Sequence, residues 1–206
     1  MIILHISDTH GKHHQLKDLP PADIIIHSGD GTEDGENEEM LEFLNWFFAL
    51  DYKYKIFVAG NHDISLDGGK LENIPEHCYY LHHSGVEIEG VKFWGVPHFF
   101  FDELDGSTEL VLNPIAVDTD ILISHRPPLY ILDFEDGNHF GCYTLYRSVM
   151  NICPRYHLFG HVHASYGIEK SRHTTFINAS LFCNDVIKNK PVLIQFENDK
   201  IEKYKT

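Results

Sequence analysis

The sequence predicts a mixed α/β protein in which two packed mixed β-sheets are flanked by helices. Short apolar strands alternate with amphipathic helical segments early in the chain, and more strand-like runs follow near the C-terminus. Of the 206 residues, 43% are hydrophobic, which is enough to fill one sizeable core. No linker or internal repeat is visible, so we expect a single domain over residues 1–206.

Buried strands are predicted where short β-branched or aromatic runs end in polar or glycine-containing turns. These runs are Met1–Ile6, Asp23–His27, Lys55–Val58, Asp120–Ser124 and Tyr156–Phe159. The stretch Val86–Val96 alternates around Glu89-Gly90 and predicts a hairpin. Thr175–Asn178 and Pro191–Phe196 predict further strands.

Two segments predict helices. Glu36–Leu50 places apolar side chains at helical spacing and acidic residues in its first turn, where the helix dipole favours them. A shorter helix is predicted over Tyr143–Asn151, in which Leu145 and Val149 lie one turn apart. Pro97–Pro114 has no clear period and predicts a long surface loop that is a candidate to cover the site.

Charge and composition exclude several classes of protein. The chain has 16 Lys+Arg against 31 Asp+Glu, and a net charge of -15 repels long nucleic acids. The opening apolar run is far shorter than the roughly 20 residues of a membrane span, so we expect no membrane association. Four scattered cysteines fit neither a zinc ribbon nor a disulfide framework, and a reducing cytoplasm is the simpler setting. Sixteen histidines favour a metal site built from imidazole and oxygen ligands.

Nearly every predicted buried strand is followed at once by residues that bind metals. They are Asp8 and His10, then Asp30, then Asn61, His62 and Asp63, then His125, and finally His161 and His163. Ligands gather at strand ends in open α/β sheets. Residues i and i+2 of an extended segment project to the same side, so each D-x-H or H-x-H pair can hold one shared region.

A single D-x-H or H-x-H fragment is weak evidence, because a lone Asp or His after a strand is more often a turn or cap residue. The complete ordered set makes coincidence improbable. Gly29, Gly60 and Gly160 precede the ligand positions, where we expect them to let the backbone turn sharply.

The ordered motifs resemble the calcineurin-like metallophosphoesterase superfamily, whose pattern runs D-x-H, G-D, G-N-H, a later His and then G-H-x-H. The resemblance covers Ile2 to Phe196. Several segments look more narrowly like the small metallophosphoesterase-domain proteins, some of which hydrolyse cyclic nucleotides. These segments are His27-Ser28-Gly29-Asp30, Ala59-Gly60-Asn61-His62-Asp63, Ser124-His125-Arg126-Pro127-Pro128, Phe159-Gly160-His161-Val162-His163 and Ile177-Asn178-Ala179-Ser180.

The resemblance implies an αββα sandwich that holds two divalent metal ions, with Mn expected first and Fe or Zn as alternatives. One ion would be bound by Asp8, His10, Asp30 and His163, and the other by Asp30, Asn61, His125 and His161. Asp30 is then the bridge. Every motif position carries a residue able to act as a ligand, which favours a working enzyme.

The mechanism that this resemblance implies is attack of a metal-bound hydroxide on phosphorus. His62 would act as general acid toward the leaving oxygen, with Asp63 orienting its ring. The alternative for His62 is a hydrogen-bonded structural histidine. Arg126 is a candidate for contacting a phosphate oxygen, and an exposed structural arginine is an equal alternative.

The remaining histidines carry no ligand motif. His5, His27 and His157 lie within or at the end of apolar strands and are expected in the core or behind the ligands. His13 and His14 are candidates for the rim of the site. His98 and His139 are candidates to contact the substrate, although solvated loop histidines are the expected alternative, and His77, His82 and His83 are unassigned.

We expect hydrolysis of a small phosphodiester or phosphomonoester, with cyclic nucleotides favoured by the resemblance alone. A nuclease or a protein phosphatase on the same site is a second possibility, although the acidic surface disfavours the nuclease. A metal-binding scaffold or interaction module is the alternative from another class, and its sign would be missing ligands. Whether the chain is a monomer or a homo-oligomer stays open.

Overall fold

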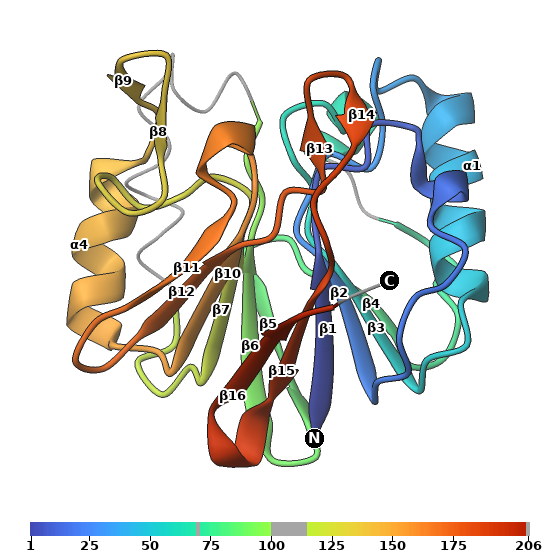
Figure 1. Ribbon diagram of the computed structural model, residues 1–206. Coiled ribbons are helices and arrows are strands. Elements are labelled where there is room, and N and C mark those ends of the chain that lie inside the picture. Colours follow the sequence, from blue (N-terminus) through green and yellow to red (C-terminus); the bar gives the residue numbers. More distant parts are fainter. Residues whose placement is uncertain (69–70, 100–114, 205–206) are drawn as a thin grey trace.

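Two six-stranded sheets pack face to face in the computed structural model, which describes residues 1–68, 71–99 and 115–204. Helix α1 (Asn37–Ala49) covers the outer face of one sheet, and helix α4 (Tyr143–Ile152) covers the outer face of the other (Figure 1). This arrangement confirms the predicted fold class of two mixed sheets flanked by helices.

The first sheet has the strand order β16-β15-β1-β2-β3-β4. Its strands are β1 (Ile2–Ile6), β2 (Ile24–His27), β3 (Tyr54–Phe57), β4 (Cys78–Tyr80), β15 (Val192–Gln195) and β16 (Lys200–Lys203). From β1 to β4 each strand is parallel to the next, whereas β15 and β16 are antiparallel to their neighbours. Helix α1 makes the crossover between β2 and β3.

The second sheet has the order β11-β12-β10-β7-β6-β5. Its strands are β5 (Ser84–Ile88), β6 (Val91–Val96), β7 (Ile121–Ser124), β10 (Tyr156–Phe159), β11 (Gly167–Lys170) and β12 (Thr175–Asn178). The inner strands β6, β7, β10 and β12 are parallel, and the two edge strands are antiparallel. The parallel strands of both sheets therefore end at one edge of the molecule (Figure 1).

Short hairpins and 3-10 helices lie in the loops that connect the strands of the two sheets. Two hairpins pair β8 (Phe134–Glu135) with β9 (Asn138–His139), and β13 (Phe182–Cys183) with β14 (Val186–Ile187). The 3-10 helices are η1 (His13–Gln15), η2 (Ile64–Leu66), η3 (His163–Ser165) and η4 (Phe196–Asn198). Within the described part of the chain, no helix is both long and apolar enough to cross a bilayer.

The alternation of side chains along each strand divides the core into layers. Ile24 and Ile26 of β2 pack between the sheets with Ile123 of β7, whereas Ile25 faces α1 and packs in the cluster that contains Phe43. Burial of each such side chain stabilises the fold by about 1.5–3 kcal/mol. Because both faces of the inner strands are covered, these strands are mostly apolar, with His5, Lys55 and His157 as buried exceptions, and polar residues follow their ends.

The predicted strands and helices are confirmed, each within two residues of its expected bounds. The edge strands β4, β11 and β16 were not predicted, because they are short and partly exposed and carry no clear apolar pattern. Of the loop predicted over Pro97–Pro114, residues 100–114 lie outside the described residues. Its first residues, Pro97, His98 and Phe99, are buried rather than on the surface.

Candidate metal centre

The loops after β1, β2, β3, β7 and β10 meet where the two sheets adjoin at their carboxyl ends. The backbone brings the first two loops together, because Asp8 donates its N–H to the carbonyl of Gly29, and Thr9 and His10 both donate to the carbonyl of Asp30. The residues predicted to bind metal are all found at this edge, and their nitrogen and oxygen atoms form overlapping groups.

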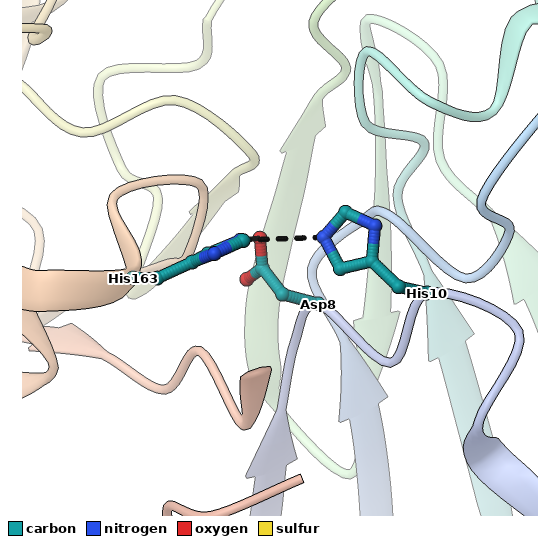
Figure 2. A group of neighbouring side chains, drawn as sticks. All are labelled: Asp8, His10 and His163. Carbon is teal, nitrogen blue, oxygen red and sulfur yellow. Dashed lines mark hydrogen bonds and ion pairs between the residues drawn. The ribbon is translucent and has the colours of Figure 1, made fainter. Parts of the chain in front are cut away.

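The first group contains Asp8, His10 and His163, whose candidate ligand atoms lie within 4.8 Å of one another. Figure 2 shows the His163 and His10 side chains approaching from opposite sides, with the Asp8 carboxylate between these two residues. The Nε2 atoms of His10 and His163 are 3.2 Å apart, and His163 Nε2 lies 3.3 Å from Asp8 Oδ1. Two imidazole nitrogens and a carboxylate that converge in this way are a donor set suited to a divalent cation.

The second group contains Asp30, His125 and His161. His125 Nε2 lies 3.2 Å from Asp30 Oδ2 and 3.1 Å from the amide oxygen of Asn61. The other nitrogen of His125, Nδ1, faces the carbonyl of Ser28 at 2.8 Å, which orients the ring with Nε2 toward the group.

Asp30 links the groups. Its Oδ2 atom also lies 3.7 Å from His10 Nε2, and a third group of converging ligand atoms joins His10, Asp30 and His62. The donors are buried carboxylate oxygens, imidazole nitrogens and one amide oxygen, and this set fits divalent Mn, Fe or Zn. The fold therefore has candidate clusters for the divalent metals that such donors bind.

The charges of the site are mutually stabilised. Burial acts to raise the pKa of Asp30, but the neighbouring His125 outweighs it and holds that pKa well below its usual range. Burial likewise acts to lower the pKa of His125, but Asp30 outweighs it and raises that pKa to about 9. Burial lowers the pKa of His161 to about 3, so its ring is neutral and able to act as a ligand. In the metal-free protein, His125 holds a proton that a cation must displace.

The backbone of the site is strained. Asp8, His10, Asp30 and His161 adopt positive φ angles of 54°, 43°, 56° and 69°. The left-handed region costs a residue with a Cβ roughly 1–2 kcal/mol. This strain is concentrated at the candidate ligands, as is typical of functional sites, and the surrounding sheets must supply the energy that maintains it.

The glycines of the motifs serve mainly to allow close approach. A Cβ at Gly160 would lie 2.1 Å from Asp8 Oδ2, and a Cβ at Gly60 would lie 2.3 Å from Asp30 Oδ1. Of the three glycines expected to provide sharp turns, Gly29 has a positive φ, of 106°, whereas neither Gly60 nor Gly160 does. At those two positions the missing side chain makes room for a carboxylate.

Behind the candidate ligands lies a layer of buried polar residues. His5 Nε2 is 2.9 Å from Ser28 Oγ, and His157 Nε2 is 2.8 Å from Ser124 Oγ. His27 Nε2 is 3.1 Å from Thr9 Oγ1. These histidines are fully buried, in agreement with the expectation that they lie in the core or behind the ligands.

The environments of His62 and Asp63 correct one expected role. The ring of His62 is held by the carbonyl of Glu33, which lies 2.6 Å from Nδ1, and not by Asp63. The buried carboxylate of Asp63 instead accepts hydrogen bonds from the backbone N–H groups of Asp30, Gly60 and Thr32, and from the Thr32 hydroxyl. Because its oxygens are used by the loops, Asp63 positions Asp30 and does not orient the His62 ring.

Two residues at the site, Glu33 and Phe182, were not predicted, and a third, His98, was expected to be solvated or in contact with substrate. His98 is buried, with its ring centroid 5.4 Å from that of His161 and 6.3 Å from that of His125, so it is not a solvated loop residue. It lies two residues after the end of β6, so the strand-end pattern could have indicated it. Glu33 lies 3.3 Å from His10 Nδ1, and Phe182 of β13 packs on the rings of His10 and His163. No sequence pattern marks Glu33 or Phe182 as a residue of the site.

His13 and Arg126 are placed more clearly by the structure. His13 is buried against Phe43 and Trp46 and does not line a rim, whereas its neighbour His14 is exposed. Arg126 is half-buried, and its Nε donates a 2.7 Å hydrogen bond to the carbonyl of Phe140. This bond ties the loop after β7 to the segment that follows the β8–β9 hairpin.

Comparison with known proteins agrees with this geometry. The family model described as "Calcineurin-like phosphoesterase" matches residues 1–165. A UPF0046 protein from Caenorhabditis elegans is 34% identical over 216 residues, a match that covers 93% of this chain and 73% of that protein. The human metallophosphoesterase domain-containing protein 1 is 33% identical over 225 residues, with 92% of this chain and 69% of that protein covered.

A solved structure shares the fold at low sequence identity. It is titled as a novel archaeal phosphodiesterase, and it superposes with a TM-score of 0.52 at 17% identity, covering 99% of each chain. At this identity the likeness concerns the fold alone.

Proposed function

The chain belongs to the calcineurin-like phosphoesterase family and is a phosphoester hydrolase, and we propose that it hydrolyses a small phosphodiester or phosphomonoester at a site for two divalent cations. The observation that carries the proposal is the sharing of Asp30 between a group with His10 and a group with His125 and His161. A shared carboxylate is how a protein holds two cations close enough to act on one phosphate.

The assignment of ligands follows the contacts. We assign Asp8, His10, Asp30 and His163 to one cation, and Asp30, Asn61, His125 and His161 to the other. The short distances between His10 and His163 Nε2, and from His125 Nε2 to Asp30 and Asn61, support this division. We expect Mn²⁺, with Fe or Zn as alternatives, because the donors are nitrogen and oxygen. Such cations activate water and neutralise charge on the phosphate when they are bound.

His62 is proposed as the general acid. Its Nδ1 faces a carbonyl oxygen, which only accepts hydrogen bonds, so Nδ1 carries a proton. The remaining nitrogen, Nε2, is then protonated only in the imidazolium form, and this is the form able to donate to a leaving oxygen. The ring lies beside that of His10, with centroids 4.7 Å apart, which brings it to the edge of the candidate metal groups. Arg126, one residue after His125, is proposed to contact a phosphate oxygen.

The proposed substrate is small. A net charge of -15 opposes binding of a long nucleic acid, whereas a single phosphoester adds little charge and would be met by the bound cations. Cyclic nucleotides are the first candidates because of the resemblance to small metallophosphoesterase-domain proteins. We also propose a cytoplasmic setting, because the four cysteines are free.

The test is a substrate panel with purified protein and Mn²⁺. The panel contains bis-p-nitrophenyl phosphate, p-nitrophenyl phosphate, and 2′,3′- and 3′,5′-cyclic nucleotides. We expect metal-dependent turnover of at least one of these phosphoesters, and two bound metals per chain by elemental analysis. Inactivity over the whole panel with two metals bound would favour the scaffold alternative.

Asp30→Asn provides the matched test of the shared ligand. An amide oxygen is a poorer bridge than a carboxylate, so this variant should lose bound metal and turnover together. Asp51→Asn, at an exposed position, is the control and should retain both. Full metal content in Asp30→Asn would show that Asp30 does not bridge the cations.

A further inference from the structure

The segment around the β8–β9 hairpin exposes a group of aromatic rings. Tyr130, Phe134 and His139, which we call the aromatic platform, have exposed fractions of 67%, 52% and 40%. The His139 ring contacts the other two, with its centroid 4.8 Å from that of Tyr130 and 5.1 Å from that of Phe134. Exposed apolar groups gathered in this way commonly mark a binding surface.

The platform is held rigidly. The carboxylate of Asp133, which is 1% exposed, lies 2.7 Å from His139 Nδ1 and accepts hydrogen bonds from the N–H groups of Tyr130 and Gly141. Tyr130 and Leu132 have positive φ angles of 69° and 49°, a conformation that costs such residues roughly 1–2 kcal/mol each. A strained, well-anchored segment that keeps its rings in water is pre-organised for a ligand.

Two hydrogen-bonded connections place the platform beside the candidate metal centre. On one side, Arg126 donates to the carbonyl of Phe140, and Arg126 directly follows the candidate ligand His125. On the other side, Ser165 Oγ bonds both the N–H and the carbonyl of Phe134, and Ser165 ends η3, which begins at the candidate ligand His163. Figure 1 shows the β8–β9 hairpin at the same end of the molecule as the carboxyl ends of the parallel strands.

We propose that the aromatic platform binds the nucleobase of a phosphoester whose phosphate occupies the metal centre, an inference that rests on the proposed function. A phosphate held by the cations leaves the rest of the substrate to extend toward the loops after β7 and β10, and both of these loops hold the hairpin. Aromatic side chains stack on bases of any sequence because every base has a π-face. The platform would therefore select substrates that carry a base over those that carry only a sugar.

The experiment measures binding and does not depend on turnover. Adenosine 5′-monophosphate and ribose 5-phosphate are titrated by calorimetry into Mn²⁺-loaded wild type, Phe134→Ala and Phe134→Tyr. Wild type should bind the nucleotide more tightly than the sugar phosphate. Phe134→Ala should weaken nucleotide binding by about 5-fold to 150-fold, the range for losing one stacking partner of a base, and leave ribose 5-phosphate binding unchanged. Phe134→Tyr keeps the ring and should restore binding.

Controls separate the platform from a general defect. Leu41→Ala alters another exposed apolar residue, on α1 in the opposite outer layer, and should bind both ligands as wild type does. Because Phe134 is half exposed, Phe134→Ala should keep its metal content and its unfolding temperature. If Phe134→Ala is unstable, Tyr130→Asn takes its place as the variant that lacks a ring, since asparagine tolerates the positive φ of residue 130.

The outcomes distinguish the platform from the proposed function. Equal affinity of wild type for the nucleotide and the sugar phosphate overturns the platform, as does a loss in Phe134→Ala that is equal for both ligands. Either result leaves the phosphoesterase proposal intact if the substrate panel is turned over. Conversely, base-dependent binding with no turnover on the panel would support the platform and count against the proposed hydrolysis.

Discussion

Asp63→Asn tests whether this carboxylate organises the loops of the candidate metal centre. Asp63 Oδ2 accepts the N–H groups of Asp30 and Gly60, at 2.9 and 2.8 Å, and Oδ1 accepts the N–H and hydroxyl of Thr32, at 3.1 and 2.8 Å. Asparagine keeps one acceptor oxygen and turns an NH₂ group toward the other pair of donors. Two hydrogen bonds to a charged group, worth about 1.5–3 kcal/mol each, are then lost. Burial and the charge of Asp30 raise the pKa of Asp63 to about 6, so the neutral amide also avoids part of the cost of burying a charge, and we expect the free energy of unfolding to fall by about 1–3 kcal/mol.

The assay is urea unfolding of the metal-free protein, followed by the fluorescence of Trp46 and Trp94. Chelator is present throughout, so that any change in metal affinity does not contribute to the measured stability. Asp67→Asn, at an exposed position four residues further on, is the control and should change stability by less than about 0.5 kcal/mol. A decrease of less than about 1 kcal/mol in the free energy of unfolding of Asp63→Asn would refute the loop-ordering role, because buried N–H and hydroxyl donors that lose their acceptor cost at least this much.

Three further predictions concern the site. His62→Ala should keep bound metal and lose about 10²- to 10⁴-fold in turnover of substrates with poor leaving groups, as measured by elemental analysis and steady-state kinetics; metal loss would instead make His62 a ligand. Gly160→Ala should lose metal, because its Cβ would lie 2.1 Å from Asp8 Oδ2, whereas Gly167→Ala, with nothing nearer than 3.3 Å, should not. The pKa of His125, about 9 in the folded metal-free protein against 6.5 unperturbed, predicts that Mn²⁺ affinity at the His125 position rises with pH through this window and levels above it, because the cation bound there displaces the His125 proton below pH 9. Mn²⁺ titrations that give one affinity from pH 6.5 to 9 would contradict the assignment of His125 as a ligand. By the same linkage, the stability that the metal-free protein gains from the contact of protonated His125 with Asp30 is complete below pH 6.5 and is lost as pH rises through 9.

The inner strands were predictable because burial on both faces requires mostly apolar residues. The two helices were predictable because each buries one stripe of apolar residues at helical spacing. The strands β1, β2, β3, β7 and β10 are short, mostly apolar runs followed by polar residues, and α1 has an apolar stripe at helical spacing. Edge strands such as β16, with the sequence KIEK, are half solvated and carry no comparable pattern. Their place in a sheet depends on pairing with a strand distant in the chain.

The candidate ligands were predictable for a related reason. A polar residue placed shortly after a buried strand is held near the sheet edge by the strand itself, so Asp8, Asp30 and His161 could be identified as candidates from their positions, whereas their assignment to particular cations came from the resemblance of the whole ordered set. Asn61 and His125 follow the same rule. Local sequence determines such positions because the backbone direction of a strand is set by its own residues and its immediate neighbours.

Tertiary structure alone decided how the loops use these side chains. Asp63 is adjacent to His62 in sequence, yet its carboxylate turns to the N–H groups of Asp30 and Thr32, while the carbonyl of Glu33 takes the His62 ring. Phe182 contacts the rings of the candidate ligands His10 and His163 from a hairpin near the C-terminus. The sequence determined which residues lie at the edge of each sheet, and only the packing of the two sheets decided which atoms face one another. Hydrogen bonds and ring contacts between loops depend on distances between segments far apart in the chain, and no local pattern encodes these distances.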